Sequence, residues 1–346
     1  MERFQTLSDH LKLWANDDTE KCDVAGTVER LAHGARAIAE LLAHGLLAGN
    51  LGAQAGADNA DGDAQKELDV RANELLIAGL KSASVAVVTS EELPEPLINN
   101  PNDSLIVALD PLDGSSNIDT NVSLGTIFSV LQGNGGTALT DILLPGTQQR
   151  AAGYVIYGPQ TALVMTLGVG THIFTLDPKS GDYRLTTENV QITPTTKEFA
   201  INASNFRHWD EHVRGYVDDC LSGEGGPRAA NFNMRWIASL VAECHRILSR
   251  GGVFLYPGDN REGYARGRLR LTYEANPIAW LIEQAGGAAS TGTERILDIQ
   301  PTDIHQRVPL IFGSRDEVAR IDGYYANLHP LASRSPLFGQ RGLFRA

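Results

Sequence analysis

Two apolar segments of this chain run directly into carboxylates. The segment SLIVALDPLDGSS at 104–116 carries Asp110 and Asp113 where a predicted strand ends, and VAVVTSEE at 85–92 ends in two glutamates. In layered α/β folds, ligands bind where the carboxyl ends of strands meet at one edge of a sheet. Carboxylates crowded at such an edge repel one another unless cations lie between them. The pattern therefore predicts an α/β chain with a site for divalent ions at a sheet edge.

The tripeptide Gly114-Ser115-Ser116, which follows Asp113, adds groups that bind anions. Asp, Pro and Gly all favour turns, so DPLDG taken alone is equally well interpreted as a simple turn. Free backbone N–H groups and hydroxyls near a helix start, however, form a cradle for phosphate. Mg²⁺ takes carboxylate and carbonyl oxygens and leaves positions for water and phosphate. Together with the acidic segment at 63–69, the pattern indicates a phosphate site with several metal ions.

Hydrophobic periodicity predicts helices that pack against a strand-rich segment. We expect one or two helices within 1–50, a polar loop at 52–63, and a further helix over residues 68–80. Strand-like runs separated by Gly, Pro, Asn and Asp follow at 85–90, 104–110, 126–132, 151–158, 161–168 and 171–176. Beyond them helices alternate with strands, with helices at about 208–221 and 233–249 and strands at 251–257, 269–273 and 308–314.

A change of composition near 185–197 is the best candidate for a boundary within the 346-residue chain. We expect an N-terminal subdomain over 1–195 that carries most of the metal-binding acidic residues. A C-terminal subdomain over 196–330 would bind the ligand, and 331–346 would form a tail. The length is enough for two closely packed units of this kind.

Composition excludes several classes of partner. The chain has 29 Lys and Arg against 42 Asp and Glu, and this net charge of −13 argues against a nucleic-acid binder. It lacks any run of about 18 consecutive apolar residues, so we expect no membrane partner. Its three cysteines are far apart in sequence and fit neither a disulfide framework nor a zinc cluster. The expected compartment is the cytoplasm.

Several catalytic motifs are also excluded. The sequence contains no GxxxxGK[ST] loop and no complete dinucleotide fingerprint, so neither ATP nor NAD is supported. Cys244 precedes Arg250 by the spacing of cysteine phosphatases, but the segment between them is an amphipathic helix whose amides are not open to a phosphate. Arginines gather near the C-terminal strands, and this group is either a solvated strand edge or a clamp for phosphate or sugar hydroxyls: Arg261, Arg266, Arg268 and Arg270.

Four segments together resemble the class I fructose-1,6-bisphosphatases. They are DPLDGSSNID at 110–119, SEE at 90–92, FLYP at 254–257 and LRLTYEANPIAWLIEQAGG at 269–287. The resemblance implies a layered αβαβα sugar-phosphatase fold and Mg²⁺-dependent hydrolysis of the 1-phosphate of fructose 1,6-bisphosphate, with Mn²⁺ as a possible substitute. It also implies a cytoplasmic homotetramer in carbohydrate metabolism, serving either gluconeogenesis or carbon fixation.

The resemblance assigns a role to each matching residue. The implied metal ligands are Glu91, Asp110, Asp113, Glu274 and the backbone carbonyl of Leu112. The implied acids that activate water are Asp69 and Glu92, with Asp63 on a loop that closes over the site. The cradle for the cleaved phosphate follows Asp113 and consists of Gly114, Ser115 and Ser116. Contacts to the sugar and the second phosphate fall on Asn202, Tyr256 and Arg268, with Arg235 reaching in from a neighbouring subunit.

Departures from the family pattern leave alternatives open. Trp236 stands where a phosphate-binding tyrosine is usual, Arg268 replaces a lysine, and the segment that begins at Asn202 reads NASN. These changes remove hydroxyl donors near the second phosphate. Sedoheptulose-1,7-bisphosphatase activity, alone or in addition, is one alternative, because the ketose head and 1-phosphate of the two substrates are alike. The other is a non-catalytic protein that binds a sugar phosphate or divalent ions.

Overall fold

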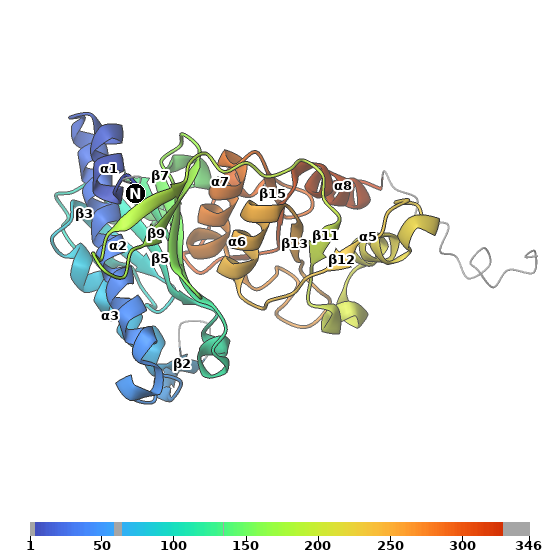
Figure 1. Ribbon diagram of the computed structural model, residues 1–346, viewed down its shortest axis with the longest axis horizontal. Coiled ribbons are helices and arrows are strands. Elements are labelled where there is room, and N and C mark those ends of the chain that lie inside the picture. The colour runs from blue at the N-terminus through green and yellow to red at the C-terminus, as the bar shows by residue number, and fades with distance from the viewer. Residues whose placement is uncertain (1–3, 59–63, 134, 328–346) are drawn as a thin grey trace, which may run out of the picture.

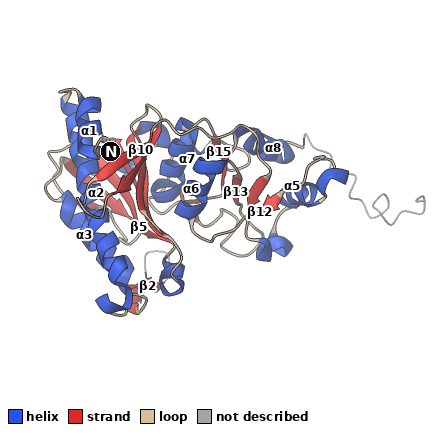
Figure 2. Cartoon of the chain, in the orientation of Figure 1, coloured by secondary structure: helices blue, strands red, loops and turns tan. Residues whose placement is uncertain are grey.

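Helices and sheets alternate in layers along the length of this protein (Figure 1). The computed structural model describes residues 4–58, 64–133 and 135–327. From one end to the other, the order of layers is helices, a large sheet, helices, a small sheet and helices (Figure 2). The predicted layered αβαβα arrangement is confirmed. Nowhere in the described ranges is a helix both long enough and apolar enough to cross a membrane.

The first layer consists of three N-terminal helices, α1 (Leu7–Ala15), α2 (Thr19–His44) and α3 (Glu67–Leu80). Each of the first two begins at a side-chain cap, since Thr6 accepts from the N–H of Asp9 and Asp18 accepts from that of Lys21. The prediction of one or two helices within 1–50 is confirmed. The loop predicted at 52–63 is partly wrong, because it contains strand β1 (Gln54–Asp58), which pairs with β2 (Ala64–Lys66).

Within the described residues, the large sheet has eight strands in the order β10-β9-β8-β7-β6-β5-β3-β4. Their bounds are β3 (Val85–Ser90), β4 (Leu97–Ile98), β5 (Leu105–Asp113), β6 (Leu124–Gln132), β7 (Gln149–Tyr157), β8 (Thr161–Thr166), β9 (Thr171–Leu176) and β10 (Tyr183–Thr187). All six predicted strands of this region are present. Strands β3 and β5 are parallel neighbours, so the residues that follow them leave the sheet at the same edge.

A bulge at the end of β5 brings two carboxylates to one face of the sheet. Asp110 and Asp113 are three residues apart, and in a regular strand they would point to opposite faces. The register against β6 shifts between them, because Asp110 pairs with Ile127 whereas Asp113 pairs with Gly125. From Asp110 to Asp113 the chain advances three residues on β5 but only two on β6. This extra residue on β5 is a β-bulge, and it brings the side chains of Asp110 and Asp113 to the same face of the sheet.

The small sheet has the order β12-β11-β13-β17-β15 in the part of the chain that is described. Its strands are β11 (Glu198–Ala200), β12 (Asn233–Met234), β13 (Val253–Tyr256), β15 (Ala288–Ser290) and β17 (Leu310–Gly313). Helices α6 (Leu240–Arg250) and α7 (Asn276–Gln284) lie between the two sheets. Helices α5 (Glu211–Leu221) and α8 (Arg315–Tyr325) cover the outer face of the small sheet. A separate pair of short strands joins β14 (Leu269–Arg270) to β16 (Arg307–Val308).

Two elements differ from the sequence-based prediction. The helix predicted over 233–249 begins only at Leu240, because Ala238 has a left-handed backbone (φ 62°) and Ser239 caps the helix. The strand predicted over 269–273 ends at Arg270 and continues as a π-helical turn, η6 (Leu271–Ala275), which leads into α7. Both differences place side chains at the sheet edge where the carboxylates gather.

Gly125 sets how closely α6 approaches the large sheet. A Cβ at this position would lie 2.4 Å from Cγ2 of Val241 and 2.8 Å from the carbonyl oxygen of Val155. Real contacts of this kind are never so short, so any larger residue must push the helix or the neighbouring strand away. Gly125 is also the partner of Asp113 in the β5–β6 ladder, and it therefore links packing to the site.

We expect Gly125→Ala to lower the free energy of unfolding by about 1–3 kcal/mol, the usual cost of overpacking. Denaturant unfolding followed by circular dichroism measures this change. Gly26→Ala is the matched control, because Gly26 lies in α2 with nothing within 4 Å of the added Cβ. There the substitution should stabilise the helix by about 0.5–1 kcal/mol. Equal effects at both positions would contradict the packing argument.

Candidate active site

Three buried carboxylates meet between the large sheet and the turn that precedes α7. Asp110 and Asp113 come from the end of β5, and Glu274 comes from η6. One carboxylate oxygen of each lies within 4.8 Å of the others, and no side chain of the three is more than 8% exposed. An all-oxygen set of this kind fits Mg²⁺ or another hard divalent ion, whereas soft metals prefer nitrogen and sulfur.

Crowding and burial raise the pKa values of this cluster. Burial, followed by the nearby charges of Glu91, Glu274 and Asp113, raises the pKa of Asp110 well above its usual range. Burial and the charge of Glu91 likewise raise the pKa of Glu274 to about 8. Groups of like charge this close together cannot all be ionised without a compensating cation. The electrostatics therefore agree with the donor set, and both indicate a site for cations.

Asp113 is also held by the N-terminus of α6. Its Oδ2 accepts a hydrogen bond from the backbone N–H of Val241 at 3.1 Å and another from the hydroxyl of Ser239 at 3.2 Å. Burial raises the pKa of Asp113 to about 6, although these hydrogen bonds oppose the shift. The start of a helix carries partial positive charge and stabilises the carboxylate. Because α6 begins at Leu240 and not at 233, as the sequence predicted, its first turn and its cap Ser239 can donate to Asp113.

Arg270 supplies positive charge within the cluster. Its Nη1 lies 2.9 Å from Oε1 of Glu91, and its backbone N–H donates to Oε2 of Glu274 at 2.6 Å. The side chain is only 9% exposed, so it is not the solvated strand edge that one interpretation of the arginine group suggested. Arg270 positions the two glutamates that lie on either side of it.

Asp69 and Glu92 line the same cavity. The backbone N–H of Lys66 donates to Oδ2 of Asp69 at 2.8 Å, and burial raises the pKa of Asp69 to about 6. Its Oδ1 is buried and makes no hydrogen bond within the described ranges. Gln65 donates through Nε2 to Oε2 of Glu92 at 2.5 Å. A buried acceptor left open beside a carboxylate cluster suits a water molecule or a metal ion.

The predicted phosphate cradle lines this cavity, which has a volume of about 370 Å³. Gly114 has a left-handed backbone (φ 80°) and starts the short helix η2 (Ser115–Thr120). This turn brings Ser115 and Ser116 to the cavity that Asp110, Leu112, Asp113 and the glutamates also line. The structure therefore brings together the carboxylates and the groups expected to hold a phosphate.

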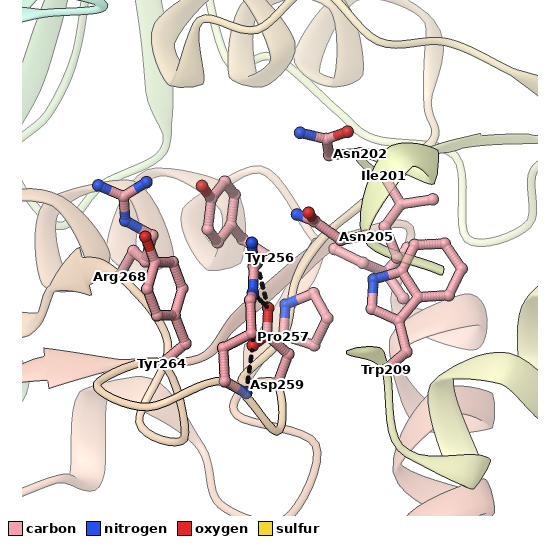
Figure 3. Close-up of a pocket in the computed structure, with 11 residues that line it drawn as sticks. Ile201, Asn202, Asn205, Trp209, Tyr256, Pro257, Asp259, Tyr264 and Arg268 are labelled. Atoms are coloured by element: carbon pink, nitrogen blue, oxygen red, sulfur yellow. Dashed lines mark hydrogen bonds and ion pairs between the residues drawn. The ribbon is translucent and has the colours of Figure 1, made fainter. Parts of the chain in front are cut away.

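A second, smaller cavity adjoins the first (Figure 3). Asn202, Tyr256 and Arg268 line it, and two of them, Tyr256 and Arg268, line the first cavity as well. Asn202 caps the short helix η4 (Ala203–His208) through a hydrogen bond from the N–H of Ser204. The ring of Trp236 lies with its centroid 6.4 Å from that of Tyr256 and stacks on Phe254 with the ring planes 6° apart.

Two predicted site residues are not brought to these cavities. Asp63 lies outside the described residues. Arg235 is not among the residues that line either cavity in the described chain, and its side chain is 47% exposed beside Glu198, with Nε 3.5 Å from Oε1. An exposed position is what a role in a neighbouring subunit would require. The contribution of Arg235 to a site stays a prediction.

Cys244 is buried, and its surroundings exclude a role as nucleophile. Burial raises the pKa of the thiol above its usual value, whereas a reactive cysteine needs a lowered pKa. It lies within α6, as the sequence indicated. Among the described residues all three cysteines are free, Cys22 being exposed and Cys220 buried.

Sequence reasoning missed the residues that support the carboxylates. Ser239 and Val241 hold Asp113, Gln65 holds Glu92, and Arg270 pairs with Glu91. For most of these no local signal exists, because the partners are far apart in the chain. The hydrogen bond from the backbone N–H of Arg270 to Glu274 differs from these, because donor and acceptor are only four residues apart.

Comparisons with known proteins agree with this geometry. The family model described as Fructose-1-6-bisphosphatase, N-terminal domain matches residues 12–188, and the corresponding C-terminal domain matches residues 192–326. The class 1 fructose-1,6-bisphosphatase of Rhodopseudomonas palustris (strain HaA2) is 53% identical over 345 residues, which is 100% of both chains. That of Rhizobium meliloti (strain 1021) is 54% identical and covers 96% of each chain.

A solved structure is also similar. The crystal structure of Leishmania major fructose-1,6-bisphosphatase in holo form has a TM-score of 0.86 and 34% sequence identity, and it covers 94% of this chain and 99% of that chain. The fold and its relatives place this protein among the phosphoric monoester hydrolases, which cleave phosphate from an alcohol oxygen. More narrowly, the chain belongs to the class I fructose-1,6-bisphosphatase family.

The raised pKa values predict how pH and Mg²⁺ affect stability. In the metal-free folded protein Glu274 has a pKa of about 8, against an ordinary value of 4.5, so the folded state holds protons that the unfolded chain releases. The stability that comes from the protonated form of Glu274 is complete at low pH and is lost as the pH rises towards 8. We therefore expect the unfolding temperature of the metal-free protein to fall between about pH 5 and pH 8.

Mg²⁺ should restore the lost stability, and should do so more at the upper end of this range, because the ionised carboxylates then bind it. Differential scanning fluorimetry with a chelator or with Mg²⁺ measures both effects. NaCl at matched ionic strength is the control. An unfolding temperature that does not respond to Mg²⁺ near pH 8 would count against a cation site here.

Proposed function

We propose that this protein hydrolyses the 1-phosphate of fructose 1,6-bisphosphate to give fructose 6-phosphate and phosphate, with Mg²⁺, or Mn²⁺ in its place, as cofactor. The observation that carries this proposal is the junction of two cavities. One has buried carboxylates and a phosphate cradle, the other has Asn202, and the two share Tyr256 and Arg268. A sugar with a phosphate at each end has the chemistry that such a pair of cavities would bind.

Two groups of residues in the first cavity would hold the reacting phosphate, one directly and one through divalent ions. The cleaved phosphate would lie at Gly114, Ser115 and Ser116, where open amides and hydroxyls donate to its oxygens. Divalent ions would be held by Glu91, Asp110, Asp113, Glu274 and the carbonyl of Leu112. When bound, such ions supply positive charge that polarises the phosphoryl oxygens and acidifies water. Arg270 keeps Glu91 and Glu274 in place for this role.

Proton transfer would fall to two further acids that line the first cavity. Asp69 and Glu92 would accept the proton of the attacking water, and a base of this kind is typically worth about 10²–10⁴ in rate. Because burial raises the pKa of Asp69 to about 6, it binds the proton more readily than an ordinary aspartate and is still ionised at neutral pH. Asp63, which lies outside the described residues, is proposed to close over the site.

The second phosphate would occupy the smaller cavity, where Arg268 supplies a permanent positive charge and Tyr256 a hydroxyl. Arg235 would reach this cavity from a neighbouring subunit of a homotetramer. Within each chain, we propose that residues 1–195 form the metal-binding subdomain and residues 196–330 the substrate-binding subdomain. A cytoplasmic location fits the free cysteines and the acidic composition.

A phosphate-release assay with Mg²⁺ tests the activity directly. Fructose 1,6-bisphosphate should be hydrolysed, and a chelator should abolish the release. Sedoheptulose 1,7-bisphosphate should be assayed in parallel, because it has the same 1-phosphate end. The comparison shows which of the two ketose bisphosphates the protein hydrolyses. A protein that binds fructose 6-phosphate and Mg²⁺ without releasing phosphate would support a binding protein and refute the proposed hydrolysis.

Asp113→Asn removes one charge from the cluster while keeping an oxygen for the N–H of Val241. We expect kcat for phosphate release to fall by about 10²–10³ or more, because the charge that holds the cation is lost. The metal-free variant should be no less stable than the parent near neutral pH, since a source of repulsion is gone.

Asp182→Asn is the matched control, because Asp182 is an exposed partner of Arg184 at the far edge of the large sheet. This variant should keep parental turnover. An Asp113→Asn protein with near-parental turnover that still depends on Mg²⁺ would refute the assignment of Asp113 as a metal ligand.

A further inference from the structure

The loop between β13 and β14, residues 257–268, forms one wall of the second cavity and is organised around Tyr264 (Figure 3). The backbone N–H of Tyr264 donates to the carbonyl of Arg261 at 3.1 Å. Its carbonyl accepts from the N–H groups of Asp259 at 3.1 Å and Gly267 at 2.9 Å. Three hydrogen bonds within a short loop therefore fix the backbone of a single residue.

Two guanidinium groups fix the ring of Tyr264. The guanidinium carbon of Arg261 lies 4.3 Å from the ring centroid, and that of Arg268 lies 5.1 Å from it. Arg261 is itself held, because its Nε donates to both carboxylate oxygens of Asp259 at 3.0 Å. Cations at these distances are attracted to the face of an aromatic ring. The ring is therefore oriented before any ligand arrives.

The hydroxyl of Tyr264 faces the space that the proposed second phosphate would fill. Figure 3 shows the hydroxyl ends of Tyr256 and Tyr264 directed to the same side as the guanidinium of Arg268. All three residues line the second cavity, and Arg268 and Tyr264 both act on the pKa of Tyr256, as close neighbours do. A guanidinium flanked by two phenol hydroxyls offers several donors to one anionic group.

The opposite wall offers amides rather than hydroxyls. Asn202 and Asn205 line it, and the nearby aromatic ring of Trp236 is used in packing against Phe254 and Tyr256. Phosphate oxygens are charged acceptors, and hydrogen bonds to them are stronger than bonds between neutral groups. The phenol hydroxyls of the loop side therefore add uncharged donors on the wall opposite the two amides.

We propose that Tyr264 is a specificity-determining residue, whose hydroxyl donates to the phosphate that stays on the sugar. Asp259 and Arg261 position its ring, and Arg268 shares the same phosphate. The inference rests on the proposed function, because it assumes a bisphosphate that spans the two cavities. It goes beyond that function by assigning a binding role to Tyr264, for which neither the motifs nor the family resemblance implied one.

Tyr264→Phe tests the hydroxyl alone, since the ring and its two cation contacts are kept. We expect KM for fructose 1,6-bisphosphate to rise by about 10- to 150-fold, the range for one lost hydrogen bond to a charged group, with a smaller change in kcat. Fructose 6-phosphate carries only the retained phosphate, and its affinity measured by calorimetry should fall by a similar factor. Tyr264→Ala should have a larger effect, because Arg268 also loses the ring that it packs against.

Tyr183→Phe is the matched control. Tyr183 is buried in β10 of the large sheet, and the substitution removes the same hydroxyl far from either cavity. Its KM should equal that of the parent. The stabilisation of Tyr264→Phe by Mg²⁺ should also be parental, because the carboxylate cluster is untouched. Loss of that response together with the rise in KM would mean a merely structural role and would overturn the proposal.

The outcomes separate this inference from the function on which it rests. If the parent protein neither hydrolyses fructose 1,6-bisphosphate nor binds fructose 6-phosphate, the proposed function fails and this inference fails with it. If the parent does both and Tyr264→Phe has an unchanged KM and an unchanged affinity for fructose 6-phosphate, only the role of Tyr264 is refuted.

Discussion

Repulsion among buried carboxylates is the constraint around which this structure is organised. Asp110, Asp113 and Glu274 lie close enough to share a cation, and burial makes their charges costly. The fold moderates this cost in two ways. The N-terminus of α6 donates to Asp113, and Arg270 pairs with Glu91 while donating to Glu274. These two sets of contacts do not neutralise the cluster. It keeps a net negative charge, as a binding site for a dication must.

The layered fold explains how one substrate could meet two chemically different cavities. The large sheet ends in carboxylates at the bulge of β5, whereas the small sheet contributes Tyr256 at the end of β13. Residues 268–274, just beyond, contribute to both sides, since Arg268 lines both cavities and Glu274 completes the cluster. The junction of the two sheets would therefore set the separation between the proposed metal-binding and anion-binding ends.

The sequence predicted the parts of this site that depend on local pattern. The apolar strands at 85–90 and 171–176 have the predicted bounds, and Glu91 after β3 lines the same cavity as Asp110 and Asp113 at the end of β5. Features that depend on distant partners could not be read in this way. The pairing of Asp113 with Val241 spans 128 residues, and the π-helical turn at Leu271–Ala275 has the same apolar character as a strand. The bulge at Asp110–Asp113 likewise exists only through its register with β6.

The distance in sequence between β5 and η6 has a consequence for how the chain folds. Asp113 finds its hydrogen-bond partners, Ser239 and Val241, only after segments 126 and 128 residues apart have come together, and contacts of such long range form late. We therefore expect the carboxylate cluster to be completed late in folding. A partly opened chain would therefore lack the assembled carboxylate cluster, because its members come from segments far apart in the sequence.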